Sequence, residues 1–168
     1  MKSKSGFTIV ELLIVIVVIG ILAAITIVAF TGIQQRARNA QVVAGVQAYQ
    51  KALLQYATVN GAYPLNGGCL GANYPENQCW KGLQGNHFIN ATLDSNLNEF
   101  IGNKPVLATE RFSIGIGDNM RAGALYSLSS SPPRIVYYLQ GLSTKCIDGS
   151  NGYAEGNTKQ CSITLPTL

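Results

Sequence analysis

The sequence predicts an α+β fold, in which a long N-terminal α-helix, half hydrophobic and half amphipathic, packs on a C-terminal antiparallel β-sheet head. Three observations lead to this prediction. No charged residue lies between Glu11 and Arg36, and almost every side chain in between is apolar. An amphipathic segment follows, with apolar residues three and four positions apart. The rest of the chain is rich in Gly, Asn, Ser and Thr, and its later apolar segments have the β-branched and aromatic character of strands.

The uncharged segment is long enough, as a helix, to cross the ~30 Å hydrocarbon core of a bilayer. Lys2 and Lys4 precede it, and Glu11 lies near its start. Three interpretations compete: a secretory signal peptide cut near Ala23-Ala24, a plain membrane anchor, and a short basic leader cut after Gly6. A carboxylate inside the apolar region argues against a signal peptide. A plain anchor would tolerate it at a cost of ~1–3 kcal/mol, but would not explain it.

Cleavage after Gly6 explains the position of Glu11. It would create a new amino group on Phe7, four residues before the carboxylate. On one helix the two groups lie a turn apart, so we expect Glu11 to pair with the Phe7 amine of a neighbouring copy. A buried charge is costly alone and much less costly in a pair. Such a pair would set the register between copies.

These residues resemble the N-terminus of type IV pilins and of the related pseudopilins. The resemblance covers about residues 2–35 and rests on GFTIVE at 6–11, LLIV at 12–15 and GILAAI at 20–25. It implies that a membrane-embedded prepilin peptidase cuts after Gly6 and also methylates the new amine of Phe7. It makes Glu11 the assembly carboxylate.

The segment departs from many Gram-negative pilins in one respect. Those proteins carry a proline soon after the Ala-Ala-Ile stretch, whereas residues 26–30 contain none. Gly20 and Gly32 are then the positions at which the helix is weakest. This pattern is closer to the pilins of monoderm bacteria.

The helical pattern continues to about residue 59. Its apolar stripe consists of Val42, Val46, Tyr49, Leu53 and Tyr56. Asn60-Gly61 is a C-cap signal, with Pro64 just beyond. Alanines also recur every four residues, at Ala40, Ala44, Ala48 and Ala52. We interpret them as a smooth face on which neighbouring helices pack; the alternative is good helix propensity on a solvated face.

The four cysteines all follow residue 68, beyond the apolar segment: Cys69, Cys79, Cys146 and Cys161. An even number beyond a membrane-targeting segment indicates two disulfides in an oxidising exterior. Three connectivities are possible, and we favour the two sequence-local bonds, Cys69–Cys79 and Cys146–Cys161. A zinc site would need paired ligands such as C-x-x-C, which the sequence lacks.

We expect three regions along the chain. Residues 61–87 are interpreted as a loop closed by the first disulfide, with Trp80 as a packing anchor. A short helix follows, with Phe88, Leu93, Leu97, Phe100 and Ile101 on one side. RFSIGIG, GALYSLS and RIVYYLQG are predicted strands, and the last cysteine pair is expected to fasten a hairpin with a long turn.

The predicted domains are a leader at 1–6, a transmembrane or filament-core helix at 7–35 and a globular head at 36–168. Within the head we expect an amphipathic helix at 36–59, a disulfide loop and short helix at 60–104, and an antiparallel sheet with a C-terminal disulfide region at 105–168.

Little in the head points to chemistry, so we predict no enzyme and no cofactor. His87, the single histidine, has no evident catalytic partner, and no phosphate-binding loop occurs. The turn with Asp148, Ser150, Asn151 and Glu155 has oxygen ligands that could suit calcium, but Asx-rich turns are common without metals, so we predict no metal site. Asn90-Ala91-Thr92 is a glycosylation sequon of low specificity.

The resemblance implies a structural subunit of a type IV pilus. The prepilin would sit in the inner (cytoplasmic) membrane with Lys2 and Lys4 inside, be processed by the prepilin peptidase, and be extracted by the pilus assembly platform into a helical homo-oligomer for adhesion, twitching motility or DNA uptake. One alternative is a pseudopilin of a type II secretion or competence system. Another is a DNA-binding minor pilin, whose scattered basic residues would form a patch: Arg111, Arg121, Arg134, Lys145 and Lys159.

Overall fold

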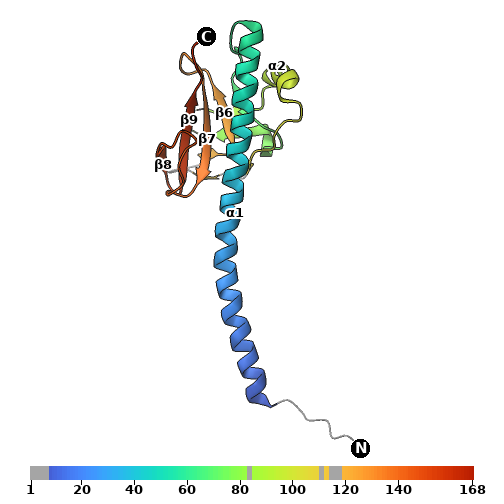
Figure 1. Ribbon diagram of the computed structural model, residues 1–168, viewed down its shortest axis with the longest axis vertical. Helices are drawn as coiled ribbons and strands as arrows, with labels where there is room; N and C mark the ends of the chain where they lie inside the picture. The colour runs from blue at the N-terminus through green and yellow to red at the C-terminus, as the bar shows by residue number, and fades with distance from the viewer. Residues whose placement is uncertain (1–7, 83–84, 110–111, 114–118) are drawn as a thin grey trace, which may run out of the picture. The chain divides into compact units, whose positions relative to one another are not determined.

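The computed structural model describes residues 8–82, 85–109, 112–113 and 119–168. A long helix is followed by strands and a second, short helix (Figure 1). The elements are α1 (Ile9–Asn60), β1 (Gly68–Leu70), the short 3-10 helix η1 (Pro75–Asn77), β2 (Gln78–Lys81), β3 (His87–Phe88), α2 (Ala91–Ile101), β4 (Phe112–Ser113), β5 (Met120–Arg121), β6 (Ala124–Ser127), β7 (Arg134–Gln140), β8 (Tyr153–Glu155) and β9 (Thr158–Thr164). The predicted α+β fold class is confirmed.

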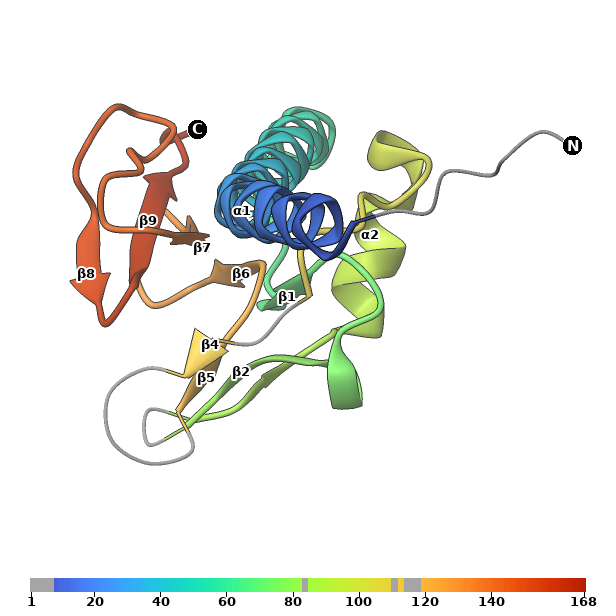
Figure 2. The same ribbon diagram turned by 90° about the horizontal axis from the view of Figure 1, so that it is seen from below.

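The chain divides into two units, Met1–Arg36 and Ala37–Leu168, and α1 runs through both. The second unit has three layers. Residues 37–60 of α1 pack on one face of a five-stranded sheet, and a four-stranded sheet packs on part of the other face (Figure 2). The short helix α2 packs against the same stretch of α1, where the rings of Tyr56 and Phe100 meet edge to face at 5.9 Å.

Both sheets are antiparallel. The five-stranded sheet has the order β1-β6-β7-β9-β8, and the four-stranded sheet has the order β3-β2-β5-β4. Strand β7 is buried on both faces from Ile135 to Leu139, which explains why these five residues are all aliphatic or aromatic. Ile135, Tyr137 and Leu139 point into the core with α1, whereas Val136 and Tyr138 point to the other sheet. Successive side chains of a strand point to opposite faces, and here both faces are covered.

The amphipathic half of α1 supplies the core as predicted. Val42, Val46, Tyr49 and Leu53 are all buried, and Tyr56 packs against them from the edge. The helix ends where the sequence indicates, since Gly61 has a φ of 71° and its N–H donates to the Ala57 carbonyl oxygen at 2.9 Å. Glycine is the residue that adopts this left-handed conformation without strain at a helix end.

The prediction that the four alanines form one smooth face is wrong, because they do not lie on the same side of the helix. Ala40 and Ala44 are exposed, Ala48 is half-buried, and Ala52 is only 1% exposed. A spacing of four residues exceeds the 3.6 residues of a helical turn, so the row rotates by about 40° with each step. Over three steps it turns from solvent into the core. Only its first two members are exposed to a neighbouring helix, and Ala52 is buried.

The region predicted as a disulfide loop, residues 61–87, in fact contributes strands to both sheets. It contains β1, η1, β2 and the start of β3, so the sheet is not confined to residues 105–168. Each strand is two to four residues long, too short for an apolar repeat to be visible in the sequence. Phe88, placed by the prediction on the apolar side of the helix, lies in β3 and is 50% exposed.

The C-terminal hairpin also differs from its prediction. Its strands β8 and β9 are joined by a short turn at Gly156-Asn157, whereas the predicted turn was long. Cys146 lies before both strands, in a turn where the Gly149 N–H donates to the Cys146 carbonyl oxygen. In the predicted RFSIGIG strand, Phe112–Ser113 forms β4, while residues 110–111 and 114–118 lie outside the described part of the chain.

Candidate functional site

The first turn of α1 contains the carboxylate that the sequence singles out. The backbone N–H of Thr8 donates to Glu11 Oε2 at 2.8 Å, and the Thr8 hydroxyl donates to the same oxygen at 2.7 Å. In return the Glu11 N–H donates to Thr8 Oγ1 at 3.2 Å. This is a capping box, in which a threonine before the helix and a glutamate three residues later satisfy each other's backbone donors.

Thr8 is not among the site residues predicted above, although T-x-x-E before an apolar run is the sequence signal of a capping box. A negative charge in the first turn also interacts favourably with the helix dipole. Glu11 therefore has a local role, fixing the start of α1, in addition to the predicted role between copies. Gly6 and Phe7, the predicted cleavage and N-methylation residues, lie outside the described residues.

The helix that follows exposes its apolar side chains. The large apolar residues from Ile9 to Ile33 whose side chains are described are 48–85% exposed. By length and composition this part of α1 is apolar enough to cross a membrane. Leaving so much apolar surface in water is unfavourable, so the segment requires lipid or other apolar helices around it.

Two disulfides stabilise the second unit. Cys69 bonds to Cys79 with an S–S distance of 2.00 Å, and Cys146 bonds to Cys161 at 1.94 Å. This is the pairing that the sequence favoured. The first bond links β1 of the five-stranded sheet to β2 of the four-stranded sheet, so it joins the two layers. The second ties the turn before β8 to the central part of β9.

The calcium candidate is an ordinary Asx turn. The Ser150 N–H donates to Asp148 Oδ1 at 2.9 Å, and this hydrogen bond lowers the pKa of Asp148. Asn151 is exposed, and the Glu155 side chain is outside the described part of the structure. Among the residues that are described, no three His, Cys, Asp or Glu side chains are grouped so that they could hold a metal ion.

The predicted basic patch is wrong for two of its residues. Arg121 is 4% exposed and Lys159 is 6% exposed, so neither forms an open surface for DNA. The register of the four-stranded sheet places Arg121 opposite Trp80, and its guanidinium lies 3.7 Å from the centre of the Trp80 ring. Lys145 is exposed. Arg111 lies outside the residues with a described position.

Trp80 has the predicted packing role. It lies between the sheets, against Val136 and Tyr138 of β7, and meets the rings of His87 and Tyr138 edge to face at 5.5 and 5.9 Å. Burial and the Arg121 charge both lower the pKa of His87, so its imidazole is neutral at pH 7.

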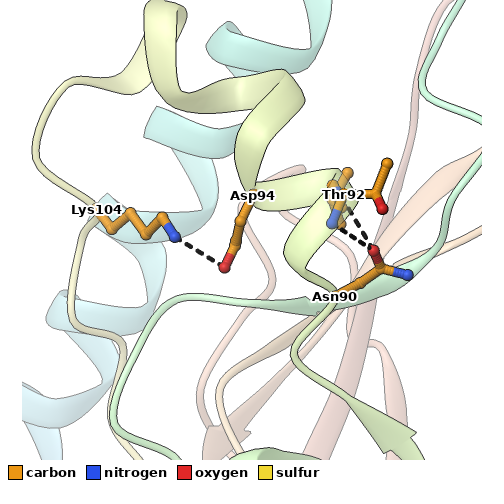
Figure 3. A network of polar contacts seen from close by, with 5 residues as sticks. Asn90, Thr92, Asp94 and Lys104 are labelled. Carbon is orange, nitrogen blue, oxygen red and sulfur yellow. Dashed lines mark hydrogen bonds and ion pairs between the residues drawn. The ribbon is translucent and has the colours of Figure 1, made fainter.

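The sequon asparagine is used inside the protein. Asn90 Oδ1 accepts from the N–H groups of Thr92 and Leu93 at 3.0 and 3.1 Å, which makes it the N-cap of α2 (Figure 3). Its amide nitrogen donates to the Gly67 carbonyl oxygen at 3.3 Å. An ion pair of 2.8 Å between Asp94, in the first turn of α2, and Lys104 links this helix to the segment that follows it. The Asn90 side chain therefore fixes the start of α2 and ties it to the segment before β1.

The comparisons with known proteins agree with the N-terminal geometry. Residues 1–27 match the family described as the prokaryotic N-terminal methylation motif. The chain is 36% identical over 63 residues to the type II secretion system core protein G of Klebsiella michiganensis, which covers 38% of this chain and 44% of that protein. It is 32% identical over 72 residues to the type IV major pilin protein PilE1 of Neisseria gonorrhoeae, covering 43% and 44% of the two chains.

A longer match joins the chain to the fimbrial protein of Neisseria meningitidis serogroup A, with 30% identity over 106 residues, 60% of this chain and 62% of that protein. The chain thus spans less than half the length of the first two relatives and less than two thirds of the third. No solved structure matches the chain. The protein carries the N-terminal methylation motif of a prepilin, and its homologues are type IV pilins and the pseudopilin G of type II secretion systems.

Proposed function

We propose that this protein is a structural subunit of a type IV pilus and not an enzyme. A prepilin peptidase removes residues 1–6 and methylates the amine of Phe7. The subunit waits in the membrane through the apolar part of α1, with its head outside, until an assembly platform transfers it into a filament on the cell surface. The observation that supports this most directly is the T-x-x-E start of α1, with a helix of exposed apolar side chains behind it.

The exposed apolar surface supports assembly by exchange of one apolar environment for another. In the membrane the side chains between Ile9 and Ile33 contact lipid, and in a filament they contact the same segment of other copies. Because both surroundings are apolar, transfer does not expose this surface to water. The carboxylate of Glu11 then meets the Phe7 amine of the next subunit, which lowers the cost of burying either charge.

Electron microscopy of cells that express the protein tests this proposal. The unmodified chain is expected to form surface filaments whose subunit, by mass spectrometry, begins at a methylated Phe7. Glu11→Ala is expected to be inserted and cleaved but absent from filaments. Glu99→Ala is the matched variant, since it removes an exposed carboxylate from α2. Normal filaments from Glu11→Ala, or a chain that stays intact at Gly6, would contradict the proposal.

A secretion pseudopilin is the second candidate, favoured by the similarity to core protein G of type II secretion systems. It shares the processing step and the helix packing, and differs in the length and purpose of the filament. Deleting the gene separates the two. Loss of surface filaments with normal protein secretion supports a pilus, whereas loss of a secreted protein without loss of filaments supports a pseudopilus.

A further inference from the structure

A cavity of about 500 Å³ lies in the second unit, between the outer face of the five-stranded sheet and the edge of the four-stranded sheet. Trp80 and His87 come from the four-stranded sheet, whereas Arg134 and Gln160 come from β7 and β9. This volume is within the ~300–1,000 Å³ typical of small-molecule sites. The functions described above make no use of it.

The cavity is positively charged. Among the described residues that line it there is one arginine, Arg134, and no aspartate or glutamate. A second guanidinium, that of Arg121, lies on the Trp80 ring at one wall. Arg134 is held in place by a hydrogen bond from its Nη2 to Ser129 Oγ at 3.2 Å. The charges therefore favour an anionic ligand.

Two of the lining side chains carry buried N–H groups without an acceptor. Neither Trp80 Nε1 nor Arg134 Nε has a hydrogen-bond partner in the part of the protein that is described. Leaving a buried donor unpaired is unfavourable. A carboxylate is the acceptor best suited to the Arg134 guanidinium that lines the cavity, because a guanidinium presents its N–H groups in one plane and at the spacing of the two carboxylate oxygens.

The floor of the cavity offers side chains and not backbone. At Leu125, Val136 and Gln160, where they line the cavity, strands β6, β7 and β9 are paired on both sides, so their ladder hydrogen bonds are already made. An extended peptide that adds to a sheet needs a free edge, which this floor does not provide. What it provides is hydroxyl and amide groups, from Ser127, Ser129 and Gln160. Such groups both donate to and accept from the hydroxyls of a sugar.

We propose that this cavity binds an acidic saccharide, a sugar whose ring carries a carboxylate, with Arg134 receiving the carboxylate and the Ser127, Ser129 and Gln160 side chains receiving the ring hydroxyls. The site deepens the proposed function and rests on it, because a pilus head is displayed where extracellular glycans occur. It gives the subunit a ligand of defined chemistry.

Binding at this site can be followed by intrinsic fluorescence, because Trp80 is the only tryptophan of the chain. Full-length protein in detergent is titrated with D-glucuronic acid, D-glucose and an acetylated dipeptide with a free C-terminal carboxylate, while tryptophan fluorescence is recorded. We expect glucuronic acid to change the emission saturably, and glucose and the dipeptide to bind at least tenfold more weakly. These comparisons use the unmodified chain, so they do not depend on the folding of a variant.

Arg134→Gln is expected to weaken glucuronic acid binding at least tenfold, while Lys51→Gln leaves it unchanged. Lys51 is an exposed residue of α1 that does not line the cavity, and its substitution changes the charge equally. Equal binding of glucose, equal or tighter binding of the dipeptide, unaltered binding by Arg134→Gln, or no response to glucuronic acid would each overturn the proposal. Because the solubilised subunit is used, these results are independent of whether filaments form.

Discussion

At the start of α1, both hydrogen bonds that Thr8 donates to the Glu11 side chain end on the same carboxylate oxygen. Both donors of Thr8 reach Glu11 Oε2, at 2.8 and 2.7 Å. Glu11 Oε1 accepts no hydrogen bond from the described residues. The same side chain can therefore cap its own helix with one oxygen and offer the other to the amine of a neighbouring subunit. Capping and assembly are compatible at a single residue.

This arrangement predicts that capping and charge can be separated by substitution. Glu11→Gln keeps an acceptor for Thr8, since glutamine also serves in a capping box, but removes the charge. We expect Glu11→Gln to be inserted and processed, and to be missing from filaments as Glu11→Ala is. Filament yield by electron microscopy and processing by mass spectrometry check this. Normal filaments from Glu11→Gln would mean that the carboxylate acts as a cap alone.

The complementary change at Thr8 tests the cap. Thr8→Val removes the hydroxyl while preserving side-chain shape, and loss of an N-cap of this kind costs about 1 kcal/mol. We expect fewer filaments than from the wild type but more than from Glu11→Gln. Thr8→Ser retains the hydroxyl and is expected to behave as wild type. If Thr8→Val and wild-type filaments are equal in yield, the capping box has no part in assembly.

The long helix could be predicted from the sequence because its signals are long. Its uncharged run, its apolar stripe and its C-cap at Asn60-Gly61 extend over many residues and agree with one another. The strands from Gly68 to Phe88 could not, since β1 and β2 take their conformation from partners far along the chain and β3 forms on the edge of β2. Gly68–Leu70, for example, is a strand only because it pairs with Ala124–Tyr126.

The same limit applies to the functional residues. Glu11 is visible because a lone carboxylate in an apolar run needs an explanation. The stacking of Arg121 on Trp80 follows from the pairing of β2 with β5, and the sequence shows no pattern that predicts either strand. For that reason the sequence suggests a surface position for Arg121, which is buried. The cavity beside Trp80 is lined by residues of both sheets that lie far apart in the chain, and no linear motif marks it.

The Cys69–Cys79 bond joins the two sheets, so its removal is expected to change the packing between them as well as the stability of the protein. In the chain-entropy estimate a loop of this size contributes about 2.7 kcal/mol, and that of Cys146–Cys161 about 3 kcal/mol. Replacing either pair by serine is expected to lower the free energy of unfolding by about these amounts. Denaturant unfolding of the full chain measures both. Only the Cys69→Ser/Cys79→Ser chain is expected to alter Trp80 emission in the native state, since Trp80 follows Cys79 in β2.

A similar change in Trp80 emission from the Cys146→Ser/Cys161→Ser chain would show that the second bond also holds the sheets together. Peptide mapping without reduction checks the pairing directly. A fragment that joins Cys69 to Cys146 would contradict the structure.

The N-cap role of Asn90 predicts that its substitution lowers the stability of the protein by weakening α2. Asn90→Ala removes the acceptor for two N–H groups at the start of α2 (Figure 3). It also removes the donor to the Gly67 carbonyl oxygen. We expect the free energy of unfolding to fall by about 1 kcal/mol or slightly more. Asn98→Ala changes an exposed asparagine of the same helix and is expected to be neutral or mildly stabilising, because alanine has the better helix propensity. Equal losses from both variants would rule out the cap.

Tyr49 makes the head sensitive to alkaline pH. Burial raises the pKa of its hydroxyl from 10.0 to about 12, and burial likewise raises the pKa of Tyr74 and Tyr126. A phenol whose pKa is raised by folding contributes fully to stability below its unfolded pKa, and this contribution is lost as the pH rises through the folded pKa. The stability of the head is therefore expected to fall between pH 10 and 12, where the unfolded chain releases protons that the folded chain retains.

Tyr49→Phe removes one of these ionising groups without changing the ring. We expect the loss of stability between pH 10 and 12 to become shallower, and the midpoint of alkaline unfolding to move to higher pH, as followed by circular dichroism and phenolate absorbance on the full chain. Tyr153→Phe is the matched variant, because Tyr153 is 66% exposed. An identical alkaline midpoint for Tyr49→Phe and Tyr153→Phe would show that Tyr49 ionises without unfolding the head, and that the core around it admits a phenolate.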